Sequence, residues 1–119
     1  MKLRTSRRTA LAAVLAFAMA AAAAAPPDPA QAMLARYGGS YDADALLKEP
    51  AVRTELARLL GGELKHLQRN LSVAGGIGIV GGVLSYDGNA DHQGGQEEAV
   101  VCVAPPGSLV EAAILSRRT

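Results

Sequence analysis

The sequence predicts an α+β fold in which short N-terminal helices pack on one face of an antiparallel β-sheet meander. Three observations lead to this prediction. Leucine and valine recur at helical spacing between Pro50 and Leu71, β-branched residues with interspersed glycines follow, and a Pro-Pro-Gly turn precedes the last apolar run. With 119 residues, 50% of them hydrophobic, the chain has room for one small domain.

The N-terminal segment has the layout of an export signal. Residues 1–8 are basic, and residues 9–25 form a 17-residue apolar stretch dominated by alanine. Because a membrane span usually needs about 20 strongly apolar residues, we expect export without a membrane span after cleavage, to the periplasm or the exterior of a bacterium. Ser6-Arg7-Arg8 is similar to part of a twin-arginine signal, and the export route stays open between the twin-arginine and Sec pathways.

Signal cleavage sets the predicted domain boundary. The three prolines within residues 26–29 are expected to stop any helix, and Ala30-Gln31-Ala32 offers the small-x-small pattern that a signal peptidase reads. Cleavage after this triplet makes residues 1–32 the signal peptide and residues 33–119 a single small domain. A cut after Ala24 is the alternative.

Charge and composition exclude nucleic acid as a partner. Residues 33–119 carry eight basic and ten acidic side chains, a net formal charge of −2, and neither Trp nor Phe. Such a domain lacks the positive charge that neutralises phosphates and the rings that stack on bases. Cys102 is the only cysteine, so the domain forms no internal disulfide. Because the core is thin, a homodimer stays open, as does a disulfide through Cys102 between two chains.

Two helices are predicted before Gly61. Asp42 or Asp44 caps a short helix that ends at Lys48, and Pro50 begins the next one at the position where a missing N–H costs nothing. Gly61 ends that second helix. Its apolar face consists of Val52, Leu56, Leu59 and Leu60, and its polar face of Arg53, Glu55 and Arg58.

A third short helix is predicted to follow. Leu64, Leu67 and Leu71 recur at i, i+3 and i+7, which is the spacing of one helix face. His66 lies off this face, so we expect it to be a solvated surface histidine.

The strands are expected over residues 71–74, 77–86, 96–103 and 109–115. The third of these is apolar on both faces, which is typical of a central strand. We expect the thiol of Cys102, within this strand, to be a small buried hydrophobe rather than a nucleophile. Pro105-Pro106-Gly107 provides the turn before the last strand.

Several patterns that could indicate chemistry lack the context they need. Gly76 to Gly81 matches G-x-G-x-x-G in form, but a strand pattern follows it instead of the helix that would receive a pyrophosphate. Ser85, His92 and Asp87 are the residue types of a hydrolase triad, and the two histidines with nearby acids are those of a metal site. No catalytic or metal-binding motif surrounds them. We therefore expect no enzyme activity, no cofactor and no metal.

The segment 87–95 is the strongest candidate for a binding site, because it is polar throughout and long for a connection between two strands. It carries a lone histidine, His92, whose two ring nitrogens both donate when the ring is charged. The neighbouring Asp91 favours that charged form. A merely solvated turn is the alternative that the residue pattern leaves open.

Two stretches of the chain carry a likeness to a known family. One is Leu46-Leu47-Lys48-Glu49-Pro50-Ala51-Val52-Arg53 with the following Leu59-Leu60-Gly61, and the other runs from Gly88 to Val103. On these stretches the run from Leu46 to Leu115 resembles the inhibitor of vertebrate lysozyme family. These are exported bacterial proteins that block lysozymes of the animal type.

The resemblance implies roles for the loop residues. Family members have a protruding loop of the form Gly-Cys-x-Pro-His-x-Cys-Gly, whose histidine enters the lysozyme cleft and engages the catalytic acids, and His92 matches it. Gly88 and Gly95 match the framing glycines. Asn89 and Gly94 stand where the two cysteines of the loop disulfide belong. The predicted partner-binding residues are His92, Asp91, Gln93, Gly88, Asn89, Gly94 and Gly95.

The departures from the family loop bear on affinity. Asp91 stands where the family has proline, and its charge approaches a cleft that has carboxylates of its own. A disulfide across so short a loop restrains it by roughly 2 kcal/mol, and a proline stiffens it further. Without both, the loop must be ordered on binding, which reduces affinity by about an order of magnitude or more.

Two hypotheses of different classes follow. The first is a non-enzymatic inhibitor that blocks the cleft of an animal-type lysozyme or another muramidase with the loop 87–95, its net-acidic body suited to basic lysozymes. The second is a divergent envelope interaction module that kept the family scaffold and lost lysozyme inhibition.

Overall fold

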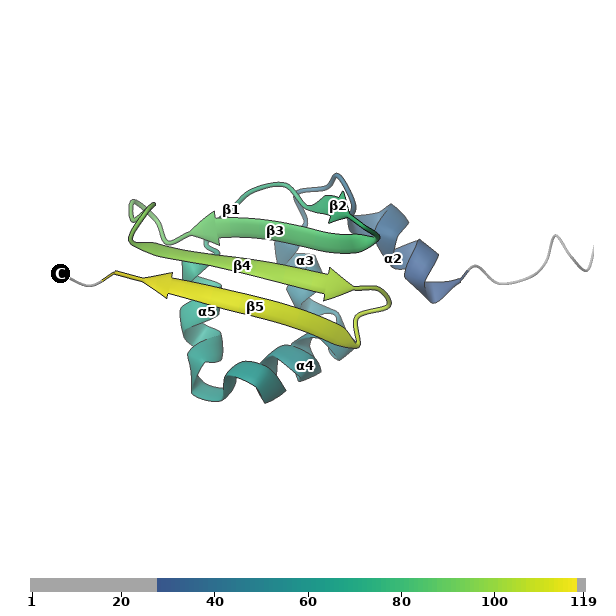
Figure 1. The fold of residues 1–119 in the computed structure, drawn as a ribbon, viewed down its shortest axis with the longest axis horizontal. Helices are drawn as coiled ribbons and strands as arrows, with labels where there is room; N and C mark the ends of the chain where they lie inside the picture. Colours follow the sequence, from purple (N-terminus) through teal and green to yellow (C-terminus); the bar gives the residue numbers. More distant parts are fainter. Residues whose placement is uncertain (1–27, 118–119) are drawn as a thin grey trace, which may run out of the picture.

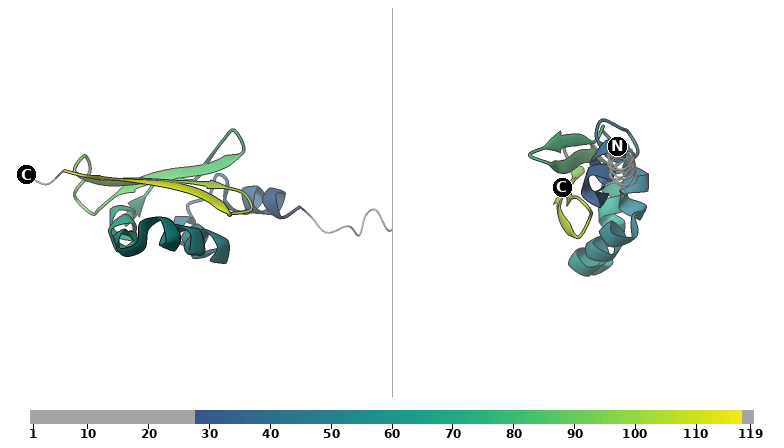
Figure 2. Two further views of the ribbon diagram at one scale, coloured as in Figure 1. Left: turned by 60° about the horizontal axis from the view of Figure 1, so that its bottom comes forward. Right: turned by 90° about the vertical axis from the view of Figure 1, so that its right-hand side faces the viewer.

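The structure is a computed structural model that describes residues 28–117, so most of the predicted signal peptide lies outside the described residues. It has two layers, helices and an antiparallel sheet, and the helices lie on one face of the sheet (Figures 1 and 2). The predicted α+β fold is confirmed. The helical elements are α2 (Pro29–Tyr37), α3 (Ala43–Lys48), α4 (Pro50–Leu60), the 3-10 helix η1 (Gly61–Glu63) and α5 (Leu64–Asn70). The strands are β1 (Val73–Ala74), β2 (Gly78–Val80), β3 (Val83–Asn89), β4 (Glu97–Ala104) and β5 (Leu109–Ser116).

Helices α3 and α4 begin and end where the sequence predicts. Asp42 is the N-cap residue of α3, although its carboxylate makes no capping hydrogen bond to the first turn. Pro50 lies in the first turn of α4, and Gly61 ends that helix with a φ of 52°. Glycine suits this position because it adopts positive φ without a steric penalty.

Helix α2 was not predicted, and the expectation that the prolines stop any helix is wrong for Pro29. Pro29 lies in the first turn of α2, and the carboxylate of Asp28 accepts a hydrogen bond from the Ala30 N–H (3.1 Å). A proline cannot continue a helix, but it can begin one because the first turn needs no N–H partner. At the other end Tyr37 is buried, and its hydroxyl donates to Glu49, which holds α2 on the domain.

The sheet is built around β3 and β4. β3, β4 and β5 form the predicted meander, and β4 lies between its two neighbours as its apolar faces predict. β1 and β2 both pair with the other edge of β3.

Two of the predicted strand boundaries are wrong. The single strand predicted over residues 77–86 is β2 and the start of β3, joined at Gly81 and Gly82, whose φ angles are 57° and 77°. Two consecutive positive φ angles are the geometry of a two-residue hairpin turn, which glycine adopts readily. The strand predicted over residues 71–74 is reduced to β1.

The turn between β4 and β5 is the predicted one. The Gly107 N–H donates to the carbonyl of Ala104 (2.9 Å), and the Pro105-Pro106 peptide bond is cis. A Cβ at Gly107 would lie 3.1 Å from Val52 Cγ2, so this turn contacts α4. It therefore joins the end of the sheet to the helical layer.

The core lies between the helices and the inner face of the sheet. Leu56 of α4 and Leu67 of α5 are buried there, as predicted. Leu59 is an exception, because 45% of it is exposed. It lines a groove with Val110 and Ala112 of β5, which is the edge strand of the sheet in the part of the chain that the structure describes.

The outer face of the sheet has no covering layer among the described residues (Figure 2). Val100 of β4 is 37% exposed on this face, and Cys102 is only partly buried, with its thiol donating to Ser85 Oγ (3.5 Å). The prediction of a buried thiol is therefore wrong. Apolar residues on both faces of β4 place it centrally in the sheet, but they do not supply a second layer.

Candidate functional site

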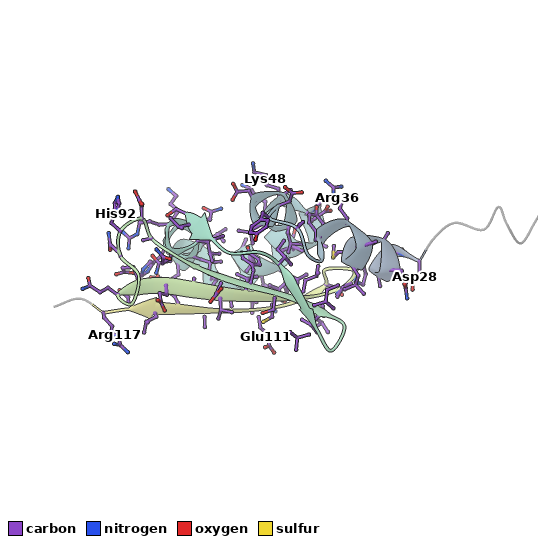
Figure 3. All side chains as sticks on the ribbon, turned by 90° about the horizontal axis from the view of Figure 1, so that it is seen from above. Asp28, Arg36, Lys48, His92, Glu111 and Arg117 are labelled. Atoms are coloured by element: carbon purple, nitrogen blue, oxygen red, sulfur yellow. The ribbon has the colours of Figure 1, made fainter. Side chains whose placement is uncertain are left out.

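The candidate loop connects β3 to β4 at one end of the sheet. Because β3 continues through Asn89, the connection consists of residues 90–96 and is shorter than the predicted loop 87–95. The strands flank it in register, with Asn89 opposite Glu98. Figure 3 shows His92 at this end of the molecule, with Asp28 at the opposite end.

The His92 side chain extends into solvent. Its side chain is 93% exposed, and Nε2 lies 3.6 Å from Oδ1 of Asp91, whose side chain is 73% exposed. Its φ of 58° is in the left-handed region, which is uncommon for a residue other than glycine. The loop thus presents the imidazole to solvent from a specific backbone conformation.

Backbone hydrogen bonds close the base of the loop. The Ala90 N–H donates to the carbonyl of Glu97, and the Gln93 N–H donates to the carbonyl of Ala90, both at 2.9 Å. The Gln93 carbonyl in turn accepts from the N–H groups of Gln96 (3.1 Å) and Glu97 (2.9 Å). The loop is therefore a closed turn, although it has no disulfide.

The two positions that match the family cysteines lie beside each other. A Cβ built at Gly94 would lie 3.9 Å from Cγ and Nδ2 of Asn89. The Asn89 side chain instead donates to the carbonyl of Ala90 (2.8 Å). A side chain at position 94 would therefore be in van der Waals contact with the side chain of Asn89.

Glycine is required at the two framing positions, 88 and 95, for different structural reasons. A Cβ at Gly88 would lie 2.6 Å from the carbonyl oxygen of Val73 and 3.0 Å from Cα of Ala74, so β1 requires glycine there. Gly95 has a φ of 83°, and its N–H donates to Oε1 of Glu98 (2.7 Å). One glycine admits a neighbouring strand, and the other provides the turn that leads into β4.

A buried polar cluster lies behind the loop, around Glu97. The Glu97 side chain is only 6% exposed, and its Oε2 lies 2.8 Å from His66 Nε2 and accepts from Asn70 Nδ2 (3.0 Å). Its Oε1 accepts from the Ser116 hydroxyl (2.7 Å), and the Arg69 guanidinium lies 3.7 Å from Oε2. Groups from α5, β4 and β5 thus meet at one carboxylate.

The electrostatics of this cluster favour the charged forms of both its acid and its base. Hydrogen bonds from His66, Ser116 and Asn70 lower the pKa of Glu97 to about 2. Hydrogen bonds to Glu97 and then to Glu63 raise the pKa of His66 above its ordinary value. The prediction that His66 is a solvated surface histidine is therefore wrong, since its side chain is 19% exposed and lies between two carboxylates.

The sequence analysis did not identify Glu97 as a buried, hydrogen-bonded carboxylate, although the sequence contains a signal for it. Glu97 shares its face of β4 with Ala99 and Val101, which are buried. A carboxylate in that alternation must be paired if it is to be buried. The partner, His66, comes from a helix 31 residues earlier and is found only in the tertiary structure.

The structure does not bring together the other residues that the sequence offered for chemistry. Ser85 lies four residues before the end of β3, which corresponds to about 13 Å along the strand at roughly 3.3 Å per residue, while His92 lies beyond that end. Within the described residues no group of three or more His, Cys, Asp or Glu side chains could hold a metal ion. Among residues 28–117 no helix is both long and apolar enough to cross a membrane.

Comparison with known proteins gives one family and no close relative. The sequence model of the family described as inhibitor of vertebrate lysozyme (Ivy) matches residues 51–119, which include the loop, the Glu97 cluster and all five strands. No curated protein and no solved structure matches at a significant level. Because the match covers more than half of the chain, this protein belongs to the inhibitor of vertebrate lysozyme family.

Proposed function

We propose that this protein inhibits a lysozyme by inserting the loop 90–96, with His92 at its tip, into the active-site cleft. The observation that carries the proposal is the 93% exposed side chain of His92 on a loop closed at its base by backbone hydrogen bonds. Family membership supports the class of partner. The exposure and position of His92 support the point of contact.

The chemistry of imidazole suits such a cleft. Lysozymes act with two carboxyl groups that flank the scissile glycosidic bond. A protonated imidazole donates from both ring nitrogens and can therefore bridge two acceptors. Asp91 lies 3.6 Å from the ring and brings a negative charge toward the acids of the partner.

The test is a lysis assay in which an animal-type lysozyme clears a suspension of sensitive bacterial cells. The protein is titrated against the enzyme and compared with His92→Asn, a substitution chosen because asparagine also tolerates a left-handed backbone. We expect inhibition by the parent. The variant is expected to raise the inhibition constant by about 30-fold or more, the effect of a central contact residue.

The control is Leu109→Ala, because Leu109 is 70% exposed and lies at the opposite end of the sheet from the loop. It is expected to inhibit within about twofold of the parent. Thermal unfolding of all three proteins shows that they are folded. Equal inhibition by His92→Asn and the parent would show that the loop does not enter the cleft.

The second candidate function is an envelope interaction module that no longer inhibits lysozyme. Asn89 and Gly94 favour it, because a family loop without its cross-link must lose more freedom on binding. The same assay separates the two functions. A folded parent protein that leaves lysis unchanged at a large molar excess supports this second function and contradicts the first.

We further propose that the protein is exported and that the signal is removed. Of the two cleavage positions, the cut after Ala24 leaves α2 intact, whereas the cut after Ala32 falls inside it. Because Asp28 caps α2 and Tyr37 is buried against the domain, we expect the first. N-terminal sequencing of the periplasmic or secreted protein checks this, and a mature chain that begins at Met33 would contradict it.

A further inference from the structure

We propose that Glu97 is a positioning residue for the His92 loop, through a buried carboxylate that fixes the two backbone groups at which the loop closes. The inference rests on the proposed function, because the loop is taken to be the inhibitory element. Glu97 is buried and makes no contact with the partner in this proposal, but it determines how well the loop is ordered before binding.

The backbone of Glu97 takes part in two of the hydrogen bonds that close the loop. Its carbonyl accepts from the Ala90 N–H, and its N–H donates to the Gln93 carbonyl, both at 2.9 Å. These partners lie on either side of His92 in the sequence. A displacement of Glu97 would therefore disturb both sides of the turn that presents the imidazole.

The side chain of Glu97 holds that backbone in place from behind. His66 and Asn70 bind its carboxylate from α5, and Ser116 binds it from β5. Figure 1 shows α5 beneath the end of the sheet from which the loop projects. Charge-assisted hydrogen bonds to a carboxylate that is only 6% exposed are strong and geometrically specific.

Asn70 extends this support to the neighbouring residues. Besides Glu97, its amide nitrogen lies 3.1 Å from the carbonyl oxygen of Glu98 and 3.3 Å from that of Leu115. Glu98 in turn accepts from the Gly95 N–H through its own carboxylate. The loop is thus joined by hydrogen bonds to α5 and β5, in place of the disulfide of the family loop.

The first arm of the test uses the protein alone, without any lysozyme. Glu97→Gln keeps the size of the side chain and removes its charge. We expect the amide hydrogens of Ala90 and residue 97, the donors of the two closing bonds, to exchange about tenfold faster in the variant, while that of Val101 in the buried sheet is unchanged. The matched control is Glu63→Gln, because Glu63 contacts the same histidine from a 68% exposed position.

The second arm is a rescue. Asn89→Cys with Gly94→Cys restores the cross-link, in a Cys102→Ser background that removes the third thiol. If Glu97 acts by ordering the loop, Glu97→Gln raises the inhibition constant about tenfold and the cross-link returns it to within about twofold of the parent. A merely structural defect would not be rescued by a disulfide confined to the loop.

The outcomes decide the inference even if the proposed function fails. If the parent does not inhibit lysozyme, the exchange rates still show whether Glu97 orders the loop. Unchanged loop exchange in Glu97→Gln, or a loss of inhibition that the cross-link does not restore, would overturn the inference. If Glu97→Gln does not fold, Ser116→Ala takes its place, because it removes one of the hydrogen bonds to the carboxylate. The inference then requires that Ser116→Ala raise the exchange rates of the two loop amides by roughly threefold.

Discussion

At the scale of single residues, His92 and the glycines around it show how local backbone geometry shapes the loop. A non-glycine residue at a φ of 58° carries a cost of order 1 kcal/mol, which the surrounding hydrogen bonds must offset. Strain of this size is found where a side chain must be presented in a fixed direction. We infer that the loop maintains the conformation of His92 at a small cost in stability.

Gly88 shows a different constraint, since what matters there is space rather than φ. The backbone of β1 runs so close to Gly88 that a methyl group would overlap the Val73 carbonyl oxygen. The resemblance to the family marks Gly88 as a framing residue of the binding loop. The structure supplies a reason for glycine at this position that does not require contact with a partner.

Gly88→Ala is therefore expected to destabilise the protein by about 1–3 kcal/mol, the usual cost of overpacking a tight contact. The measurement is the free energy of unfolding by denaturant. The control is Gly75→Ala, because the nearest atoms to a Cβ at Gly75 lie 3.7 Å away, in ordinary van der Waals contact. Equal stability of the two variants would show that β1 moves aside at little cost.

At the scale of elements, the buried polar cluster around Glu97 connects α5, β4 and β5, as the apolar core does elsewhere in the domain. A buried ion pair adds little net stability compared with an apolar pair, because both charges lose their hydration, but removing one partner is costly. The main effect of the ion pair between His66 and Glu97 is therefore to fix the position of α5 against the sheet. Leu67 and Leu71, on the apolar face of the same segment, supply the burial.

The pKa shifts of Glu97 and His66 predict how the free energy of unfolding depends on pH. The pKa of Glu97 is lowered from 4.5 to about 2, so its contribution is present above about pH 4.5 and is lost as pH falls toward 2. The pKa of His66 is raised above 6.5, so its contribution is present below about pH 6.5 and is lost as pH rises through the raised value. Stability from this pair is therefore greatest between about pH 4.5 and 6.5.

The check is the denaturant midpoint of the parent and of His66→Gln, measured from about pH 2 to well above pH 6.5, so that both declines are covered. The charged groups that face His66 are Glu63, Glu97 and Arg69. In the parent the midpoint should fall on the alkaline side. In the variant this alkaline decline should disappear, while part of the acid decline stays because Ser116 and Asn70 still bind Glu97. If His66→Gln shows the same alkaline decline as the parent, the decline is due to another titrating group.

At the scale of the whole molecule, the domain combines one covered sheet face with a net negative charge. The outer face of the sheet carries the acidic Asp87 and Glu111, in register with Val100 and Cys102, and the His92 loop projects from one end of the sheet (Figure 3). Residues 25–119, the mature chain proposed above, carry 8 basic and 11 acidic side chains and thus a net formal charge of −3. Such a body is attracted to a basic partner over distances comparable to the Debye length.

We therefore expect the rate of association with a basic lysozyme to fall as ionic strength rises from about 0.01 to 0.15 M, where the Debye length shortens from about 30 to 8 Å. The dissociation rate should change less, because it depends on contacts already formed. Surface plasmon resonance over a salt series measures both rates. An association rate that is independent of salt would show that the net charge plays no part in the encounter.

Much of this fold could be predicted because its signals are local. Pro50 and Gly61 define α4, the apolar alternation around Val101 places β4 centrally, and the polar segment after β3 contains His92. The errors occur where one residue type permits two outcomes. Pro29 can stop a helix or begin one, and a double glycine such as Gly81-Gly82 can interrupt a strand or turn it into a hairpin.

The sequence by itself determined the fold class, the family and the candidate histidine, because periodicity, turn residues and a loop motif are properties of consecutive residues. Only the tertiary structure decided that His66 and Glu97, 31 residues apart, form an ion pair behind the loop. It also decided that no element within residues 28–117 covers the outer face that bears Cys102. Long-range pairing and exposure depend on which elements meet in space, and a residue pattern along one chain does not specify that.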